Sequence, residues 1–171
     1  MNKLSNSDLE IKRLAFFKSI SKLSLLDLNN QSQGWSILQH LYHCWLVEHL
    51  TEKYIRNKIL NPTLITRVPI TSYIRFFLLQ VFLRLGYKTN APKPTSIFPD
   101  TIDLNKLNLD WSNSRESLDN LIYKLHELKL ENKGFFRHPI IGRINLRLTL
   151  NFFNFHFYHH QRQIIKIFTK L

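Results

Sequence analysis

Four long stretches with apolar residues at helical spacing most constrain what this chain can fold into. They predict helices over about residues 7–26, 36–58, 112–130 and 145–168. No strand-like alternation of apolar and polar residues appears along the chain. Helices that each carry one apolar stripe bury it by packing against one another. The sequence therefore predicts an all-α protein built as a four-helix bundle.

A long connection separates the second and third predicted helices. We expect one domain over residues 1–171 with an insertion at about residues 62–110. Within the insertion, residues 71–85 are typical of an amphipathic helix, and the proline-rich residues 91–99 cannot be helical throughout. We predict that the insertion folds over one end of the bundle as an extra helix and loop, where it could shape or cover a pocket. The competing interpretation of residues 71–85 is an interfacial membrane helix, because their Phe and Arg side chains suit one.

The chain is basic, with 24 Lys and Arg against 12 Asp and Glu and a net charge of +12. Such a charge fits nucleic acid or an anionic membrane as a partner. The basic residues are scattered singly, however, so a generally basic solvated surface is favoured over a nucleic-acid face. The single cysteine, Cys44, excludes an intrachain disulfide, and no signal peptide or membrane-spanning run is evident. These features predict a cytoplasmic protein.

Two histidines in the last predicted helix are the strongest candidates for metal ligands. His156 and His160 are four residues apart, so their side chains lie about 40° apart around a helix and share a face. His159 points about 100° away from His160. Two imidazoles on one buried face can hold a divalent metal if another element supplies a third ligand.

The second predicted helix supplies that third ligand, for which His43 is favoured. His40 is three residues earlier and also compatible with the same face, so spacing separates the two only weakly. A histidine on an apolar face is more often hydrogen-bonded to a neighbour than bound to a metal, and plain core packing is the alternative interpretation. Spacing leaves both interpretations open.

Other polar residues near these histidines have less defined roles. Gln39 could orient a metal ligand or a bound water. Glu48 lies about 140° around the helix from His43, so no general base is evident. Cys44 is interpreted as a core residue, and His138, just before a proline, is expected to stabilise a loop by hydrogen bonding.

Two sequence segments resemble the DinB-like (YfiT-like) family of metal-binding proteins. The first is Trp35-Ser36 followed by Gln39, Leu41 and His43. The second is His138-Pro139 and Gly142, followed by His156, His160 and Gln163-Ile164. The resemblance implies a bundle with up-down-down-up connectivity, frequent pairing as a homodimer, and a metal held by His43, His156 and His160.

The resemblance also implies a range of activities. Some members are thiol S-transferases that use low-molecular-weight thiols such as bacillithiol, mycothiol or glutathione, and others are metal-dependent hydrolases without a known substrate. Zinc or nickel is the expected ion, with iron or manganese also compatible with imidazole ligands. The residues after His43 are bulkier than is typical of the family, which leaves the substrate open. The alternatives are a basic module that binds nucleic acid or an anionic membrane, and a DinB-like bundle without catalytic activity.

Overall fold

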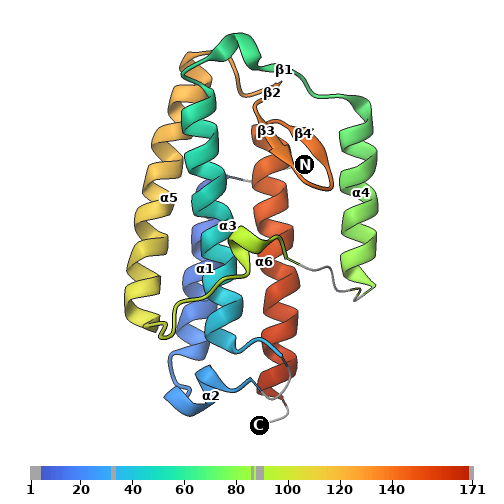
Figure 1. Ribbon diagram of the computed structural model, residues 1–171. Helices are drawn as coiled ribbons and strands as arrows, with labels where there is room; N and C mark the ends of the chain where they lie inside the picture. The colour runs from blue at the N-terminus through green and yellow to red at the C-terminus, as the bar shows by residue number, and fades with distance from the viewer. Residues whose placement is uncertain (1–4, 32–33, 86, 88–90, 170–171) are drawn as a thin grey trace.

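The computed structural model describes residues 5–31, 34–85, 87 and 91–169 (Figure 1). Its helices are α1 (Asn6–Ile20), α2 (Leu25–Asn29), α3 (Ile37–Lys58), α4 (Ile70–Arg84), α5 (Leu104–Glu127) and α6 (Leu146–Phe168). Two 3-10 turns are η1 (Pro62–Leu64) and η2 (Lys93–Thr95). The short strands are β1 (Thr66–Arg67), β2 (Lys133–Gly134), β3 (Phe136–His138) and β4 (Gly142–Ile144).

The helices α1, α3, α5 and α6 form the predicted four-helix bundle. Each of α1 and α3 packs against both α5 and α6. Figure 1 shows that α1 and α6 run in one direction along the bundle and that α3 and α5 run in the other. The crossover that makes α3 and α5 parallel contains α4. The expected up-down-down-up connectivity with an inserted helix is therefore confirmed.

The helices that carry the candidate ligands begin and end where their sequences predict. At the start of α3, Ser36 Oγ accepts a hydrogen bond from Gln39 N (3.2 Å), and Gln39 Oε1 accepts one from Ser36 N (3.0 Å). At the start of α6, Asn145 Oδ1 accepts a hydrogen bond from Leu148 N (3.0 Å). These caps hold the first turn of both helices in place.

The first predicted helix is wrong beyond Ile20, because the chain forms two helices there. The side chain of Ser24 accepts a hydrogen bond from Asp27 N, and Asp27 Oδ2 accepts one from Ser24 N. This reciprocal cap starts α2 as a separate helix. Leu25, in the first turn of α2, is exposed.

The predicted start of the third helix at residue 112 is also wrong, since α5 begins at Leu104. Asp103 Oδ1 accepts a hydrogen bond from Lys106 N (2.7 Å) and caps this earlier start. Leu107 and Trp111 are buried and extend the apolar stripe one helical turn at a time toward the N-terminus. The insertion is correspondingly shorter at its C-terminal end.

The sequence did not predict the four short strands, of which β1 follows α3 and β2 to β4 lie in the linker before α6. Strand β1 pairs antiparallel with β2, and β3 pairs antiparallel with β4. Strands of two or three residues are too short for an alternating pattern to be visible. Within the β3–β4 turn, His138 Nδ1 accepts hydrogen bonds from Ile140 N and Ile141 N, both at 3.2 Å. This confirms the predicted loop-stabilising role of His138.

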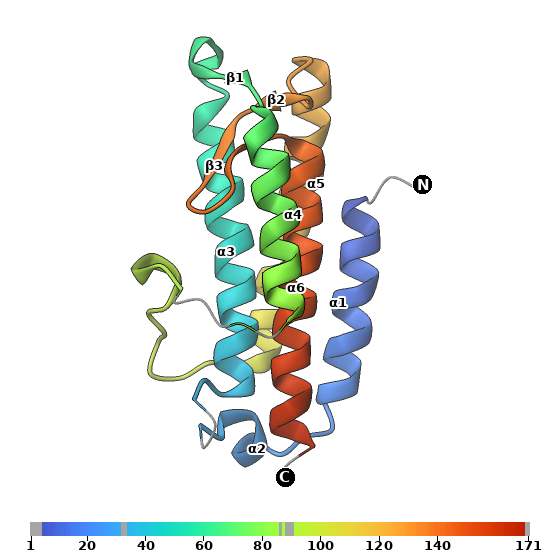
Figure 2. The same ribbon diagram turned by 90° about the vertical axis from the view of Figure 1, so that its right-hand side faces the viewer.

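The inserted helix α4 lies along the flank of α6 rather than over one end of the bundle, which corrects that prediction (Figure 2). Phe76, Leu79 and Leu83 belong to an apolar core that also contains residues of α3, α5, β4 and α6. Among the residues that the structure describes, no helix is both long and apolar enough to cross a membrane.

Candidate metal centre

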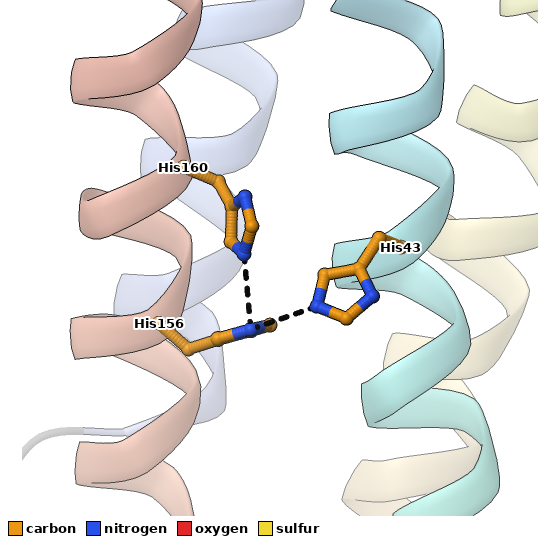
Figure 3. A group of neighbouring side chains, drawn as sticks. All are labelled: His43, His156 and His160. Carbon is orange, nitrogen blue, oxygen red and sulfur yellow. Dashed lines mark hydrogen bonds between the residues drawn. The ribbon is translucent and has the colours of Figure 1, made fainter. Parts of the chain in front are cut away.

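The structure brings His43, His156 and His160 together between α3 and α6 (Figure 3). One ring nitrogen from each lies within 4.8 Å of the other two. His43 and His160 are 4% and 7% exposed, and His156 is half-buried. The three imidazoles that the sequence singled out from two distant segments therefore form one cluster in the bundle interior.

The nitrogens that converge are the Nε2 atoms. His156 Nε2 lies 3.1 Å from His43 Nε2 and 3.2 Å from His160 Nε2. Two nitrogens that each lie about 2.0–2.1 Å from a tetrahedral zinc ion are separated by about 3.3 Å. The distances from His156 Nε2 to its two partners are thus close to those that a shared divalent ion requires.

A main-chain carbonyl determines which nitrogen of His43 is free to bind. His43 Nδ1 lies 2.7 Å from the carbonyl oxygen of Thr95 in η2. A carbonyl oxygen can only accept a hydrogen bond, so Nδ1 of His43 carries the proton. In the neutral ring, Nε2 then presents its lone pair toward His156 and His160. Histidines that bind metals typically donate their second ring N–H to a carbonyl in this way.

His40 supports the second ligand, His160. The Nδ1 atoms of His40 and His160 are 2.9 Å apart, so one of them donates to the other. When His160 is the donor, its Nε2 is left with a lone pair that faces the cluster. The sequence placed His40 near the edge of the helix stripe as a weaker candidate ligand, whereas the structure places it behind a ligand.

Burial keeps the three imidazoles neutral. It lowers the pKa of His43, although the hydrogen bond to the Thr95 carbonyl opposes this effect. For His156 and His160, burial and then the neighbouring histidines place the pKa well below the usual value of 6.5. Neutral imidazoles keep the lone pairs that bind a metal.

The donor set itself fits a cation. A neutral imidazole has one N–H and one lone pair. His156 Nε2 faces two other Nε2 atoms at once, and one N–H at that position could serve only one of them well. A divalent ion at the common point would serve all three lone pairs, so these residues are suited to hold one.

Aromatic rings wall one side of the cluster. The ring of Trp35 lies 5.1 Å from that of His43 and 5.0 Å from that of Phe98, measured between centroids. Trp35 also stacks on His160, with centroids 6.3 Å apart. Phe98 and Thr95 belong to the proline-rich part of the insertion, so this segment covers the site as predicted.

The remaining candidates lie apart from the cluster or are engaged elsewhere. The side-chain oxygen of Gln39 belongs to the cap of α3, and its role toward a metal ligand stays a prediction. Glu48 accepts hydrogen bonds from Arg115 Nη2 (2.8 Å) and Trp111 Nε1 (2.7 Å). Cys44 is fully buried, and burial raises the pKa of its thiol.

His159 and the Thr95 carbonyl mark the limits of sequence reasoning at this site. As expected, His159 is not part of the three-histidine cluster, and its Nε2 lies 2.5 Å from Gln163 Nε2. The Thr95 carbonyl was missed because a main-chain atom leaves no signal in the sequence. The supporting position of His40 did leave one, namely its spacing of three from His43.

One of three comparisons with known proteins finds a match. The comparison with curated proteins finds no match, and the comparison with solved structures finds none either. The model of the DinB superfamily matches residues 8–164, which run from the first turn of α1 into the last turns of α6 and include all three histidines of the cluster. The chain therefore belongs to the DinB superfamily.

Proposed function

We propose that this protein binds a divalent metal ion through His43, His156 and His160 and uses it to transfer a low-molecular-weight thiol to a small electrophile. The hydrogen bond from His43 Nδ1 to the Thr95 carbonyl carries the proposal, because it aims Nε2 at the other two imidazoles. Zinc and nickel are the favoured ions, and iron or manganese would also accept imidazole ligands.

The ligand set favours a catalytic over a structural metal. Three neutral imidazoles leave coordination positions open, as in catalytic zinc sites. A bound metal would lower the pKa of a coordinated water or thiol and so supply a nucleophile at neutral pH. His43, His156 and His160 would hold and orient that ion, while Trp35 and Phe98 exclude water from one side.

Among the described residues, no carboxylate belongs to the histidine cluster, and this favours thiol transfer over hydrolysis. Metallohydrolases commonly pair the metal with a glutamate that acts as general base. In the described part of the chain, the cluster that could hold a metal contains histidines alone. The candidate Glu48 instead accepts hydrogen bonds from Arg115 and Trp111. A thiol needs no such base, since coordination removes its proton. The thiol sulfur would then bond to the electrophilic carbon, and the leaving group would depart with its electron pair.

Metal content of untagged protein tests the binding step. After reconstitution with zinc, nickel, iron or manganese, we expect about one ion per chain, and a higher melting temperature with metal than without. His43→Ala, His156→Ala and His160→Ala should each lose the ion. The controls His49→Ala, on the same helix as His43, and His126→Ala, on the surface of α5, should keep it. A parent protein that stays metal-free with every ion contradicts the proposal.

A thiol-consumption screen tests the reaction step. The metal-loaded protein should consume bacillithiol, mycothiol or glutathione in the presence of alkyl-halide electrophiles, and His160→Ala should not. Stable metal binding without turnover in this screen would instead identify a DinB-like bundle that binds metal and lacks catalysis. Hydrolysis of ester or amide substrates without any thiol would identify a metal-dependent hydrolase.

A further inference from the structure

Helix α4 presents a broad apolar surface to the outside of the bundle. Ile74, Phe77 and Leu78 are 54%, 62% and 57% exposed. We call the exposed apolar side chains of this helix and its C-terminal end the outer face of α4; they are Ile70, Tyr73, Ile74, Phe77, Leu78, Val81, Phe82, Leu85 and Tyr87. Single exposed apolar residues are normal on proteins, whereas contiguous patches mark interaction sites.

The outer face lies opposite the side by which α4 packs on the bundle. Phe76, Leu79 and Leu83 are buried and follow one another at helical spacing. At 100° per residue, the outer face is centred about 180° from these positions. Figure 2 shows α4 in front of α6, with no described element in front of it. A helix that is apolar all round is normally covered on all sides.

Helix α4 and the elements that pack against it, α6 and β4, carry basic side chains and no acidic ones. The sequence has no Asp or Glu between Glu52 and Asp100, and none after Glu131. The charged side chains of helices α4 and α6 and of strands β1 to β4 are therefore all basic. Their described basic residues are Arg67, Arg75, Arg84, Lys133, Arg137, Arg143, Arg147, Arg162 and Lys166.

Several of these cations lie beside the outer face. Arg75 and Arg84 belong to α4 itself and are exposed. The guanidinium of Arg84 lies over the ring of Phe155, 5.6 Å from its centroid. Arg162 on α6 donates a hydrogen bond from Nη1 to the carbonyl oxygen of Arg84 (3.2 Å). Lys166, one helical turn further, shares the side of α6 that Arg162 occupies.

We infer that the outer face of α4 docks the protein peripherally on a membrane rich in anionic phospholipid. Phe, Tyr, Ile and Leu side chains would enter the boundary between headgroups and acyl chains. Arg75, Arg84 and Arg162 would remain at the level of the phosphates, where anionic lipid attracts cations. The helix is too short to span a bilayer, so it would lie parallel to the surface.

The charges and apolar side chains of this face favour a membrane over a second copy of the chain or nucleic acid. Two copies meeting across this face would bring like charges together with no acidic side chain to offset them. The homodimer expected from the family would thus use another surface. Nucleic acid would satisfy the arginines, but its phosphate backbone gives no reason for so many exposed apolar side chains between them.

Vesicle flotation tests the inference. The full chain should float with vesicles made of equal parts phosphatidylcholine and phosphatidylglycerol, and it should stay behind with phosphatidylcholine alone. Rising salt should weaken the binding. The double variant Ile74→Ser/Phe77→Ser should reduce binding by about tenfold or more, because both side chains lose apolar burial. Arg75→Gln/Arg162→Gln should reduce it and remove most of its salt dependence.

Matched changes on α5, which carries acidic residues, serve as controls. Leu109→Ser and Lys124→Gln alter exposed residues of that helix and should leave vesicle binding unchanged. A polarity-sensitive dye on Val81→Cys should report an apolar environment only with anionic vesicles, whereas the same dye on Leu109→Cys should not. The native thiol of Cys44 is buried and should not compete for the dye.

Three results would overturn the inference. The first is an absence of binding to anionic vesicles. The second is a dimer in gel filtration that Ile74→Ser/Phe77→Ser converts to a monomer, with vesicle binding unaffected, since that would assign the outer face to a second copy. The third is duplex DNA binding that depends on Arg75 and Arg162 together with vesicle binding that ignores the outer face. Metal content should be the same in all these variants, so the outcome is independent of the proposed activity.

Discussion

The imidazole of His138 acts as a hydrogen-bond acceptor inside the turn before α6. Its Nδ1 accepts from two main-chain N–H groups, and burial lowers its pKa from 6.5 to about 4. Protonation therefore favours the unfolded chain. Stability is highest above pH 6.5 and falls as the pH drops from 6.5 toward 4, by about 3 kcal/mol in total for this one group.

His138→Asn should flatten this part of the pH profile. The Asn side-chain oxygen can replace Nδ1 as acceptor without a titrating group, although the ring contact with Phe152 is lost. We expect a lower free energy of unfolding at pH 7 and a smaller loss between pH 6.5 and 4. Urea denaturation at several pH values measures both. A variant whose profile runs parallel to that of the parent would show that His138 does not control this window.

His40→Phe should weaken metal binding without removing a ligand. The substitution keeps an aromatic ring but deletes the nitrogen that lies 2.9 Å from His160 Nδ1. Loss of such a supporting hydrogen bond typically costs about 10–100-fold in metal affinity. Competition with a chelator measures the change, and His49→Phe on the same helix is the control. Equal affinity in parent and variant would mean that His160 needs no partner at Nδ1.

Residue spacing predicted the pair His156 and His160, the resemblance to DinB-like proteins added His43, and neither predicted the hydrogen bonds that support them. The interval of four between His156 and His160 is a geometric statement about one helix, and the structure bears it out. The hydrogen bond between His43 and the Thr95 carbonyl depends on how the crossover folds back on α3. No residue type at position 95 encodes that bond, because every residue carries a carbonyl.

At the scale of the element, Gln39 tests whether the start of α3 and the metal cluster are separate. Its side-chain oxygen caps the helix, so Gln39→Ala should lower the free energy of unfolding by about 0.5 to 1 kcal/mol and leave metal affinity unchanged. Gln39→Glu is the matched control, because glutamate can complete the same cap. A lower metal affinity in Gln39→Ala would instead indicate that Gln39 orients a metal ligand or a bound water.

The start of a helix was predictable where a capping residue stands directly before a clear helical pattern of apolar residues. Ser36 and Asn145 stand directly before such stripes, and α3 and α6 begin at the next residue. The start of α5 was missed because Asp103 caps a first turn that precedes the recognisable stripe by two turns. Strands β1 to β4 gave no signal because they are shorter than one full alternation.

At the scale of the whole molecule, a buried ion pair joins three bundle helices. Arg115 on α5 pairs with Glu48 on α3 (2.8 Å) and donates to Asn6 Oδ1 on α1 (3.0 Å). Both charged side chains are almost fully buried. Glu48→Gln would leave the buried charge of Arg115 with only the partly exposed Glu10, 3.8 Å away, as its counter-charge. Removing one partner of a buried pair typically costs about 3–5 kcal/mol.

Urea denaturation should show that loss, and Glu48→Met/Arg115→Met should recover part of it because no unpaired charge remains. Glu116→Gln, an exposed change on α5, is the control and should stay within about 0.5 kcal/mol of the parent. A loss below about 1 kcal/mol in Glu48→Gln would mean that water reaches the pair.

The bundle as a class was predictable from helical periodicity, whereas its connectivity came from the resemblance to DinB-like proteins. Periodicity says which side of a helix is buried and is silent about which helices are neighbours. The placement of α4 along the flank of α6 escaped prediction for a related reason. Its residues are apolar on both sides, so the sequence alone could not tell the packed side from the exposed one.

The crossover holds His43 through the main chain at Thr95, and this makes its length matter more than its composition. Substituting Thr95 leaves the carbonyl in place, so drift in the identity of that residue is tolerated. Deleting or adding a residue beside it would move the oxygen by the length of a whole peptide unit, about 3.8 Å, and release the imidazole. The residue type at position 95 can therefore change during evolution, whereas a change in the number of residues beside it would break this hydrogen bond.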